Sequence, residues 1–201
     1  MPAAGRDGFL PLYDPFTRLF GFQRALRALI DQAELQRDHV VLDVGCGTGT
    51  LAVLIKRRHP TVDVIGLDPD PAALAIAQRK AAKAGAAVRL ERGFGDALPF
   101  GEERFDRVFS SMMFHHLKRE ERPKVLEEIR RVLKPGGRLE FLDFSGARHS
   151  LLGGLVHGHQ TLPAAEDKLI TRMREAGFAD GSRMAERRTF FGPIGFYQAR
   201  T

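Results

Sequence analysis

The 201-residue chain contains a single cysteine, no tryptophan and two tyrosines. Because Cys46 has no partner within the chain, an internal disulfide is excluded, and so is a metal or iron–sulfur site built from cysteines. The start, MPAAGRDGFLPLYDP, lacks the basic start followed by an apolar run that a secretory signal peptide has. No apolar stretch reaches the roughly 18 residues that a membrane span needs. These absences predict a cytoplasmic protein without a membrane span.

Long runs of like charge are also rare along most of the chain, although the formal net charge is +6. In KREERPKVLEEIRRVLK, basic and acidic residues are interleaved, which is typical of a solvated helix face. The least balanced stretch is the C-terminal third, which carries Arg172, Arg174, Arg183, Arg187, Arg188 and Arg200. No basic arm, zinc-ligand set or aromatic RNA-binding motif accompanies these arginines. A nucleic-acid partner is therefore disfavoured.

Strand-like and helix-like apolar patterns alternate along the chain, and 43% of the residues are hydrophobic. This alternation predicts one α/β domain over residues 1–201, with a mostly parallel sheet covered by helices on both faces. Strands are expected at 39–46, 62–68, 87–94, 105–111, 138–144, 183–191 and 195–200. Helices are expected at 49–58, 71–84, 119–134 and 165–176, with an N-terminal helical cap in 1–36. Pro135 and Gly136 are expected to end the third of these helices.

The segment VLDVGCGTGT, residues 41–50, joins a buried-strand pattern to a helical pattern. Gly45, Gly47 and Gly49 allow a sharp turn there and let backbone N–H groups approach a ligand with no Cβ in the way. A dinucleotide-binding fingerprint would need a third glycine at position 50, where Thr50 stands. The spacing therefore argues against a nicotinamide dinucleotide.

Ligands of open α/β sheets bind beyond the carboxyl ends of the strands. Asp68 ends the second expected strand, roughly 20 residues after the glycine loop, where nucleotide-binding folds place a ribose-binding acid. Its alternative role is to cap the next helix. Asp70, followed by Pro71, fits that role better. Asp68 is therefore predicted to accept hydrogen bonds from ribose hydroxyls.

The fourth expected strand ends in SSMMFHHL, where His115 and His116 are adjacent. Either histidine is a candidate catalytic base for a hydroxyl or an acidic carbon, because the unperturbed pKa of histidine lies near 6.5. The alternative is that both are structural hydrogen-bonding residues.

The glycine loop, Asp68, the ALPF turn and RVLKPGGRLEFLDF together resemble the class I methyltransferases that use S-adenosylmethionine, over nearly the whole chain. The early YD and the FLDFS segment are most similar to the branch that contains the ubiquinone and menaquinone C-methyltransferases. This resemblance implies a doubly wound, Rossmann-like fold whose seven-stranded, mostly parallel sheet has an antiparallel last strand. It also implies S-adenosylmethionine as the cofactor, while the lack of a cysteine or histidine ligand set predicts no metal.

The resemblance also implies which residues contact the cofactor: Asp43, Gly45, Cys46, Gly47, Gly49, Asp68, Pro69, Phe94, Gly95, Asp96 and Ser110. Asp43 matches the acid that helps hold the methionine amino group, whereas Cys46 is expected to be a small packing residue. Many relatives place an adenine-binding acid four residues before Leu-Pro-Phe, a position that Phe94 occupies here. Either Asp96 or the loop around Phe94 is then expected to meet the adenine.

The segment after the fifth expected strand, SGARHSLLGGLVHGHQTLPAAEDK, interrupts the alternation of strands and helices. Its His149, His157 and His159 have a spacing that fits no standard closed zinc set. Residues 145–163 are either an exposed loop or a substrate lid. As a lid, this segment and the N-terminal FLPLYDPFTRLF would supply an apolar pocket.

The implied activity is methyl transfer to a carbon or oxygen atom of a small, fairly apolar metabolite, the expected partner molecule. One alternative is a methyltransferase acting on RNA or protein. The fourth strand, however, lacks the Asn-Pro-Pro-Tyr or Asp-Pro-Pro-Tyr of the nitrogen methyltransferases of DNA and of protein glutamine. The other alternative is a non-catalytic module that binds S-adenosylmethionine, which the intact glycines and Asp68 disfavour. The oligomeric state stays open.

Overall fold

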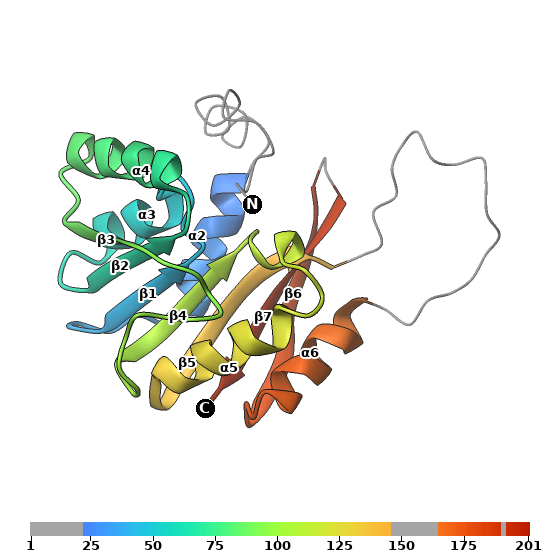
Figure 1. Ribbon diagram of the computed structural model, residues 1–201. Coiled ribbons are helices and arrows are strands. Elements are labelled where there is room, and N and C mark those ends of the chain that lie inside the picture. The colour runs from blue at the N-terminus through green and yellow to red at the C-terminus, as the bar shows by residue number, and fades with distance from the viewer. Residues whose placement is uncertain (1–21, 146–164, 190–191) are drawn as a thin grey trace.

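The computed structural model describes residues 22–145, 165–189 and 192–201. Within these ranges the chain forms a seven-stranded sheet in the order β3-β2-β1-β4-β5-β7-β6 (Figure 1). The strands are β1 (Val40–Val44), β2 (Asp63–Asp68), β3 (Val88–Arg92), β4 (Phe105–Ser111), β5 (Leu133–Phe144), β6 (Asp180–Thr189) and β7 (Gly192–Arg200). Strands β1 to β5 are parallel, and β7 is antiparallel to both β5 and β6. The predicted α/β sheet with an antiparallel last strand is confirmed.

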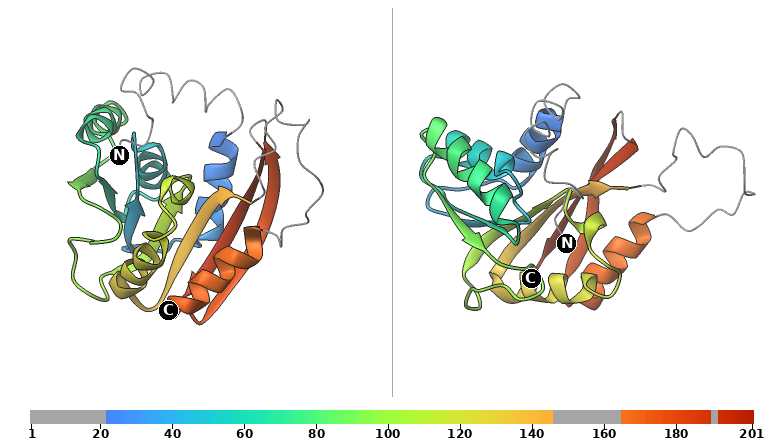
Figure 2. Two further views of the ribbon diagram at one scale, coloured as in Figure 1. Left: turned by 45° about the vertical axis from the view of Figure 1, so that its right-hand side comes forward. Right: turned by 45° about the horizontal axis from the view of Figure 1, so that its top comes forward.

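Helices cover both faces of the sheet, as the strand–helix alternation predicts. Helices α2 (Phe22–Gln32), α3 (Thr50–Arg58) and α4 (Pro71–Lys83) are grouped together, away from α5 (Arg122–Val132) and α6 (Ala165–Glu175) (Figure 2). A short 3₁₀ helix, η1 (Phe114–His116), follows β4. The strand order reverses between β1 and β4, and this reversal creates a crevice at their carboxyl ends. None of the described helices is long and apolar enough to span a membrane.

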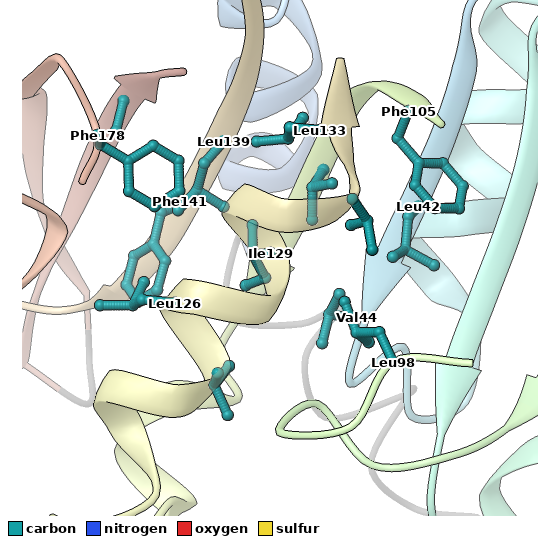
Figure 3. Packing of buried hydrophobic residues seen from close by; sticks show 14 of the residues in the cluster. Leu42, Val44, Leu98, Phe105, Leu126, Ile129, Leu133, Leu139, Phe141 and Phe178 are labelled. Carbon is teal, nitrogen blue, oxygen red and sulfur yellow. The ribbon is translucent and has the colours of Figure 1, made fainter. Parts of the chain in front are cut away.

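The face of the sheet that packs against α5 and α6 carries the larger apolar core (Figure 3). Successive side chains of a strand point to opposite faces of the sheet, so Leu42 and Val44 of β1 share this face, and both are buried in this core. Phe141 of β5 is fully buried, with its ring 5.2 Å from the Phe114 ring and 6.1 Å from the Tyr197 ring, both edge-on. This aromatic contact joins η1 to the centre of the sheet.

On the opposite face, α2 is held by apolar and polar contacts. Its buried residues, Ala25, Leu26, Leu29 and Ile30, lie at helical spacing on one side, while residues 1–21 lie outside the described chain. Gln32 donates to Glu140 at 2.7 Å, and Arg107 donates to the carbonyl of Ala33 at 2.9 Å. Arg138 also donates to that carbonyl, so two cations stabilise the carboxyl end of the helix.

Some strand boundaries differ from the sequence prediction. Helix α5 ends at Val132, and β5 already begins at Leu133, which pairs with Phe105 of β4. The register then shifts before Arg138 pairs with Arg107, so the Pro-Gly-Gly segment forms an irregularity inside the strand. β6 and β7 likewise begin three residues earlier than expected, because they pair with each other over almost their whole length.

We predict that Phe141→Ala lowers the free energy of unfolding by about 3–5 kcal/mol, because it removes a fully buried ring and leaves a cavity among packed neighbours. Urea denaturation would measure this change. Phe94→Ala is the control: the Phe94 side chain is 61% exposed, and its loss should change the free energy by about 0.5 kcal/mol or less. Equal losses for the two variants would contradict this description of the core.

Candidate functional site

The glycine loop, residues 45–49, turns sharply from β1 into α3. Gly45, Gly47 and Gly49 all have positive φ, at 70°, 52° and 73°. A Cβ on Gly45 would collide with the side chain of Met113, and one on Gly49 would lie 2.8 Å from the Cβ of Ala77 in α4. At Gly47, by contrast, a Cβ would meet no atom of the described chain within 4 Å. The two outer glycines thus permit close packing, and the middle one borders open space.

That open space belongs to a cavity of about 470 Å³ at the carboxyl ends of β1, β2 and β4. Nine of the predicted site residues line it: Gly45, Cys46, Gly47, Asp68, Pro69, Phe94, Gly95, Asp96 and His116. The other four, Asp43, Gly49, Ser110 and His115, lie outside its lining. Ser111 lines the cavity in place of Ser110, which is buried with no hydrogen-bond partner for its hydroxyl among the described residues. The sheet therefore gathers most, but not all, of the predicted residues.

Asp68 ties the end of β2 to the glycine loop. One carboxylate oxygen accepts the Gly47 N–H at 2.8 Å, and the other accepts the Asp70 N–H at 2.9 Å. Burial raises the pKa of Asp68, and these two backbone donors oppose the rise. Asp70 accepts the Ala72 N–H at 2.8 Å and caps α4, as predicted. A carboxylate has roughly four acceptor sites, so Asp68 retains capacity for further donors in the cavity.

Asp43, in the middle of β1, is fully buried, and neither of its carboxylate oxygens has a hydrogen-bond partner among the described residues. Burial, together with the charge of Asp68, raises the pKa of Asp43 to about 7. The Ala52 amide opposes this rise, although it falls short of hydrogen-bond geometry. An uncompensated buried carboxylate is costly, so its position behind the glycine loop favours a cationic ligand group nearby.

Cys46 and Lys80 both stabilise the loop. The Cys46 thiol is buried next to Gly66, and this burial raises its pKa, which excludes a thiolate nucleophile near neutral pH. Lys80 of α4 donates to the Thr48 hydroxyl at 3.0 Å and to the Thr50 hydroxyl at 2.6 Å. Sequence reasoning missed Lys80, because no local motif links a lysine of α4 to threonines some 30 residues earlier.

The loop after β3 forms another wall of the cavity. Phe94 and Ala97 are bridged antiparallel, so Phe94, Gly95 and Asp96 form a tight turn that lines the cavity. The following turn is held from α5, where Glu128 accepts the Leu98 N–H at 2.8 Å. Both candidates for an adenine contact, Asp96 and the loop around Phe94, are therefore at the cavity.

The two histidines occupy different positions. His116 lines the cavity, and its ring centre lies 3.9 Å from that of His115. His115 Nδ1 is 2.6 Å from Oδ1 of Asp143, and its backbone N–H donates to Oδ2 of Asp143 at 3.0 Å. Sequence reasoning missed Asp143. Its position near the carboxyl end of the fifth strand was the only feature that could have indicated a place in the site.

The predicted lid, residues 145–163, lies outside the described chain except for Ser145, so the lid and its histidines stay predictions. The Ser145 N–H donates to the Pro193 carbonyl at 3.0 Å, and its hydroxyl donates to Glu186 at 2.8 Å. In the part of the chain that the structure describes, no group of three or more histidine, cysteine, aspartate or glutamate side chains is arranged to hold a metal ion.

Comparison with known proteins places these features in a family. A family model described as a methyltransferase domain matches residues 41–137. A demethylmenaquinone methyltransferase of Thermus thermophilus is 41% identical over 137 residues, which cover 67% of this chain and 61% of that protein. A second demethylmenaquinone methyltransferase, from Thermotoga maritima, is 31% identical over 206 aligned residues, which cover 86% of this chain and 85% of that protein.

The fold agrees with this placement. The crystal structure of an S-adenosylmethionine-dependent methyltransferase from Aquifex aeolicus aligns with a TM-score of 0.72 at 21% identity, over 98% of this chain and 99% of that one. The chain spans only about three fifths of the Thermus protein, whereas it matches the Thermotoga protein over most of both lengths. The chain belongs to the class I S-adenosylmethionine-dependent methyltransferases, in the branch that contains the ubiquinone and menaquinone C-methyltransferases.

Proposed function

We propose that this protein transfers the methyl group of S-adenosylmethionine to a carbon or oxygen atom of a small, fairly apolar acceptor. The observation that carries this proposal is the cavity, which is bordered by the glycine loop and Asp68 and has the buried, unpartnered carboxylate of Asp43 behind it. When bound, S-adenosylmethionine supplies a methyl group on a positively charged sulfur.

The residues around the cavity fit this cofactor. Asp43 is suited to the cationic amino group, because a cation offsets the cost of burying its carboxylate. Asp68 has acceptor capacity left for ribose hydroxyls. The turn at Phe94 to Asp96 offers an exposed ring and a carboxylate for the adenine. Gly47 leaves room for the ligand against the backbone.

The other side of the cavity is apolar, which supports an apolar acceptor. Phe22 and Leu26 of α2 line it, together with Met112 and Met113 of the connection after β4. Met112 has a φ of +54°, a conformation that is strained for a residue with a side chain. Such a wall excludes water and binds a flat apolar ring. The relatives named demethylmenaquinone methyltransferases support an acceptor of the naphthoquinol type.

The position of the arginine-rich strand also supports a small acceptor over RNA. Arg183, Arg187 and Arg188 lie on β6, the edge strand, four strands away from β1 and its glycine loop. None of the three lines the cavity. An anionic polymer bound along β6 would therefore not be directed to the methyl group by these residues.

Binding and methyl transfer together test the proposed function. Calorimetry should show micromolar binding of S-adenosylmethionine and of its demethylated product, S-adenosylhomocysteine, and no binding of NAD, because a dinucleotide fingerprint is missing. Cofactor with a labelled methyl group is then incubated with a 2-prenyl-1,4-naphthoquinol, 2-naphthol, transfer RNA and a protein mixture. We expect the label in the aromatic alcohols. Tight NAD binding, or label confined to RNA or protein, would overturn the proposal.

Gly47→Ala should weaken S-adenosylhomocysteine binding about tenfold or more, because its new methyl group would occupy space beside the bound ligand. Gly85→Ala is a matched control, since Gly85 also has a positive φ, of 58°, and open space around a Cβ, but it lies outside the cavity lining. Both variants should lose about 1 kcal/mol of stability, which thermal unfolding would show. Equal affinities in the two variants would contradict the ligand's position.

Binding of S-adenosylhomocysteine should strengthen as the pH rises from about 6 to 8. The pKa of Asp43 is raised to about 7 in the free protein, and a bound ammonium group favours the ionised carboxylate, so binding releases a proton. Calorimetry in buffers of different ionisation enthalpy would count that proton. Asp43→Asn should bind more weakly and lose the pH dependence.

Glu140→Gln provides the control for the pH experiment. Burial also raises the pKa of Glu140 to about 7, but Glu140 lies on β5, two strands away from β1, and already accepts hydrogen bonds from Gln32 and Gln198. The variant should keep the pH dependence of binding. If Glu140→Gln rather than Asp43→Asn abolished it, the assignment of the amino group to Asp43 would be wrong.

A further inference from the structure

We infer that Asp143 positions His115 as a general base, so that the acceptor is one that must lose a proton, a hydroxyl compound or an acidic carbon, rather than an amine or a thioether. This inference rests on the proposed function and names the acceptor class for the same site. Asp143 is a positioning residue, and His115 is the group that would take the proton.

The contact between the two residues is short and well defined. Oδ1 of Asp143 is 2.6 Å from Nδ1 of His115, and Oδ2 accepts the His115 backbone N–H at 3.0 Å. The Phe144 N–H also donates to Oδ1, at 2.8 Å, so three donors fix the carboxylate, which is 4% exposed. Because carboxylate oxygens accept hydrogen bonds, Nδ1 carries the proton, and Nε2 of the neutral ring is left as the acceptor.

The His115 ring is partly exposed and lies next to His116, which lines the cavity. The side chain of His115 is 27% exposed, while the Asp143 side chain that holds Nδ1 is only 6% exposed. The centre of this ring is 5.1 Å from that of Phe144 and 3.9 Å from that of His116. The Met112 N–H donates to the Leu142 carbonyl at 2.8 Å, so the whole connection is anchored to β5 beside Asp143. Nε2 is the ring nitrogen that Asp143 leaves available, on a ring that is separated from the cavity only by the neighbouring ring of His116.

This arrangement matches the requirement of one class of acceptor. A hydroxyl or an activated ring carbon becomes a strong nucleophile only as it loses its proton, whereas an uncharged amine or a thioether already has an available electron pair. The acceptor's O–H or C–H bond breaks, and its proton goes to Nε2 of His115. The released electron pair forms the bond to the methyl carbon, while the carbon–sulfur bond breaks and leaves its pair on a neutral thioether.

His115→Asn separates this role from a purely structural one. The asparagine amide places a donor near the position of Nδ1 and can keep the contact to Asp143, but it has no nitrogen equivalent to Nε2. With 2-naphthol as acceptor, we expect kcat to fall about a hundredfold or more. The KM for the cofactor and the thermal stability should stay close to those of the unchanged protein.

A second acceptor sharpens the measurement. A nitro-substituted naphthol that is already ionised at the assay pH needs no base, so His115→Asn should slow its methylation much less than that of 2-naphthol. Similar losses with both acceptors would overturn the inference. Full activity of His115→Asn, or loss of activity only in His116→Asn, would overturn it as well.

The tautomer of His115 gives a readout that does not require turnover. Long-range ¹H–¹⁵N NMR spectra should show the proton on Nδ1 in the unchanged protein, and a shift toward Nε2 in Asp143→Asn, where the amide becomes a donor. Asp106→Asn is the matched control. Asp106 also holds a backbone N–H, that of Val40 at 2.8 Å, but it pairs with Lys134 near the opposite ends of the strands. Asp106→Asn should leave the tautomer unchanged.

The outcomes distinguish this inference from the proposed function. No binding of S-adenosylhomocysteine, or no transfer to either naphthol, would contradict the proposed function, and the inference would fall with it. Binding and transfer with an unaffected His115→Asn variant, or a proton on Nε2 in the unchanged protein, would contradict the inference alone.

Discussion

The tie between the end of β2 and the glycine loop is the contact on which the site depends. The Leu67 carbonyl accepts the N–H groups of Gly45 and Cys46, and the Asp68 carboxylate accepts that of Gly47. These bonds hold a loop whose glycines have left-handed backbone conformations, which an isolated peptide would not maintain. Without them the loop would lose the open space at Gly47, and the cavity would lose its floor.

This tie concentrates negative charge in one place, and the rest of the site compensates for it. Burial, together with the charge of Asp68, raises the pKa of Asp43 to about 7, so Asp43 is only partly ionised near neutral pH. Backbone amides relieve Asp68, and Lys80 brings a positive charge to the threonines of the loop. Asp43 has no such partner among the described residues, so a cationic ligand there would gain more than one that is neutral.

The opposite side of the cavity is built on β4 and β5. The T-shaped contact of Phe114 with Phe141 fixes η1 on the sheet, and Asp143 then holds His115 from the same strand, β5. A ring contact and a polar contact from β5 therefore both hold η1 in place. The methionines that face the cavity and the histidines that border it keep a fixed relation to the glycine loop, because β1 and β4 are paired neighbours.

The sequence by itself determined the succession of strands and helices along the chain, the glycine loop, the Asp70 cap and nine of the residues that line the cavity, because each depends on local spacing or on a contiguous motif. Tertiary structure decided what depends on distant pairing. Sheet register set where β5 begins, and side-chain direction placed Ser111 rather than Ser110 at the cavity. Asp143 and Lys80 contact partners that are 28 and 30 residues away in the sequence. Helical and strand periodicities predict contacts only between residues that are close in the sequence, so they could not predict these two. The parallel sheet brings Asp143 to the edge where β4 ends, and the packing of α4 beside the glycine loop brings Lys80 to the threonines.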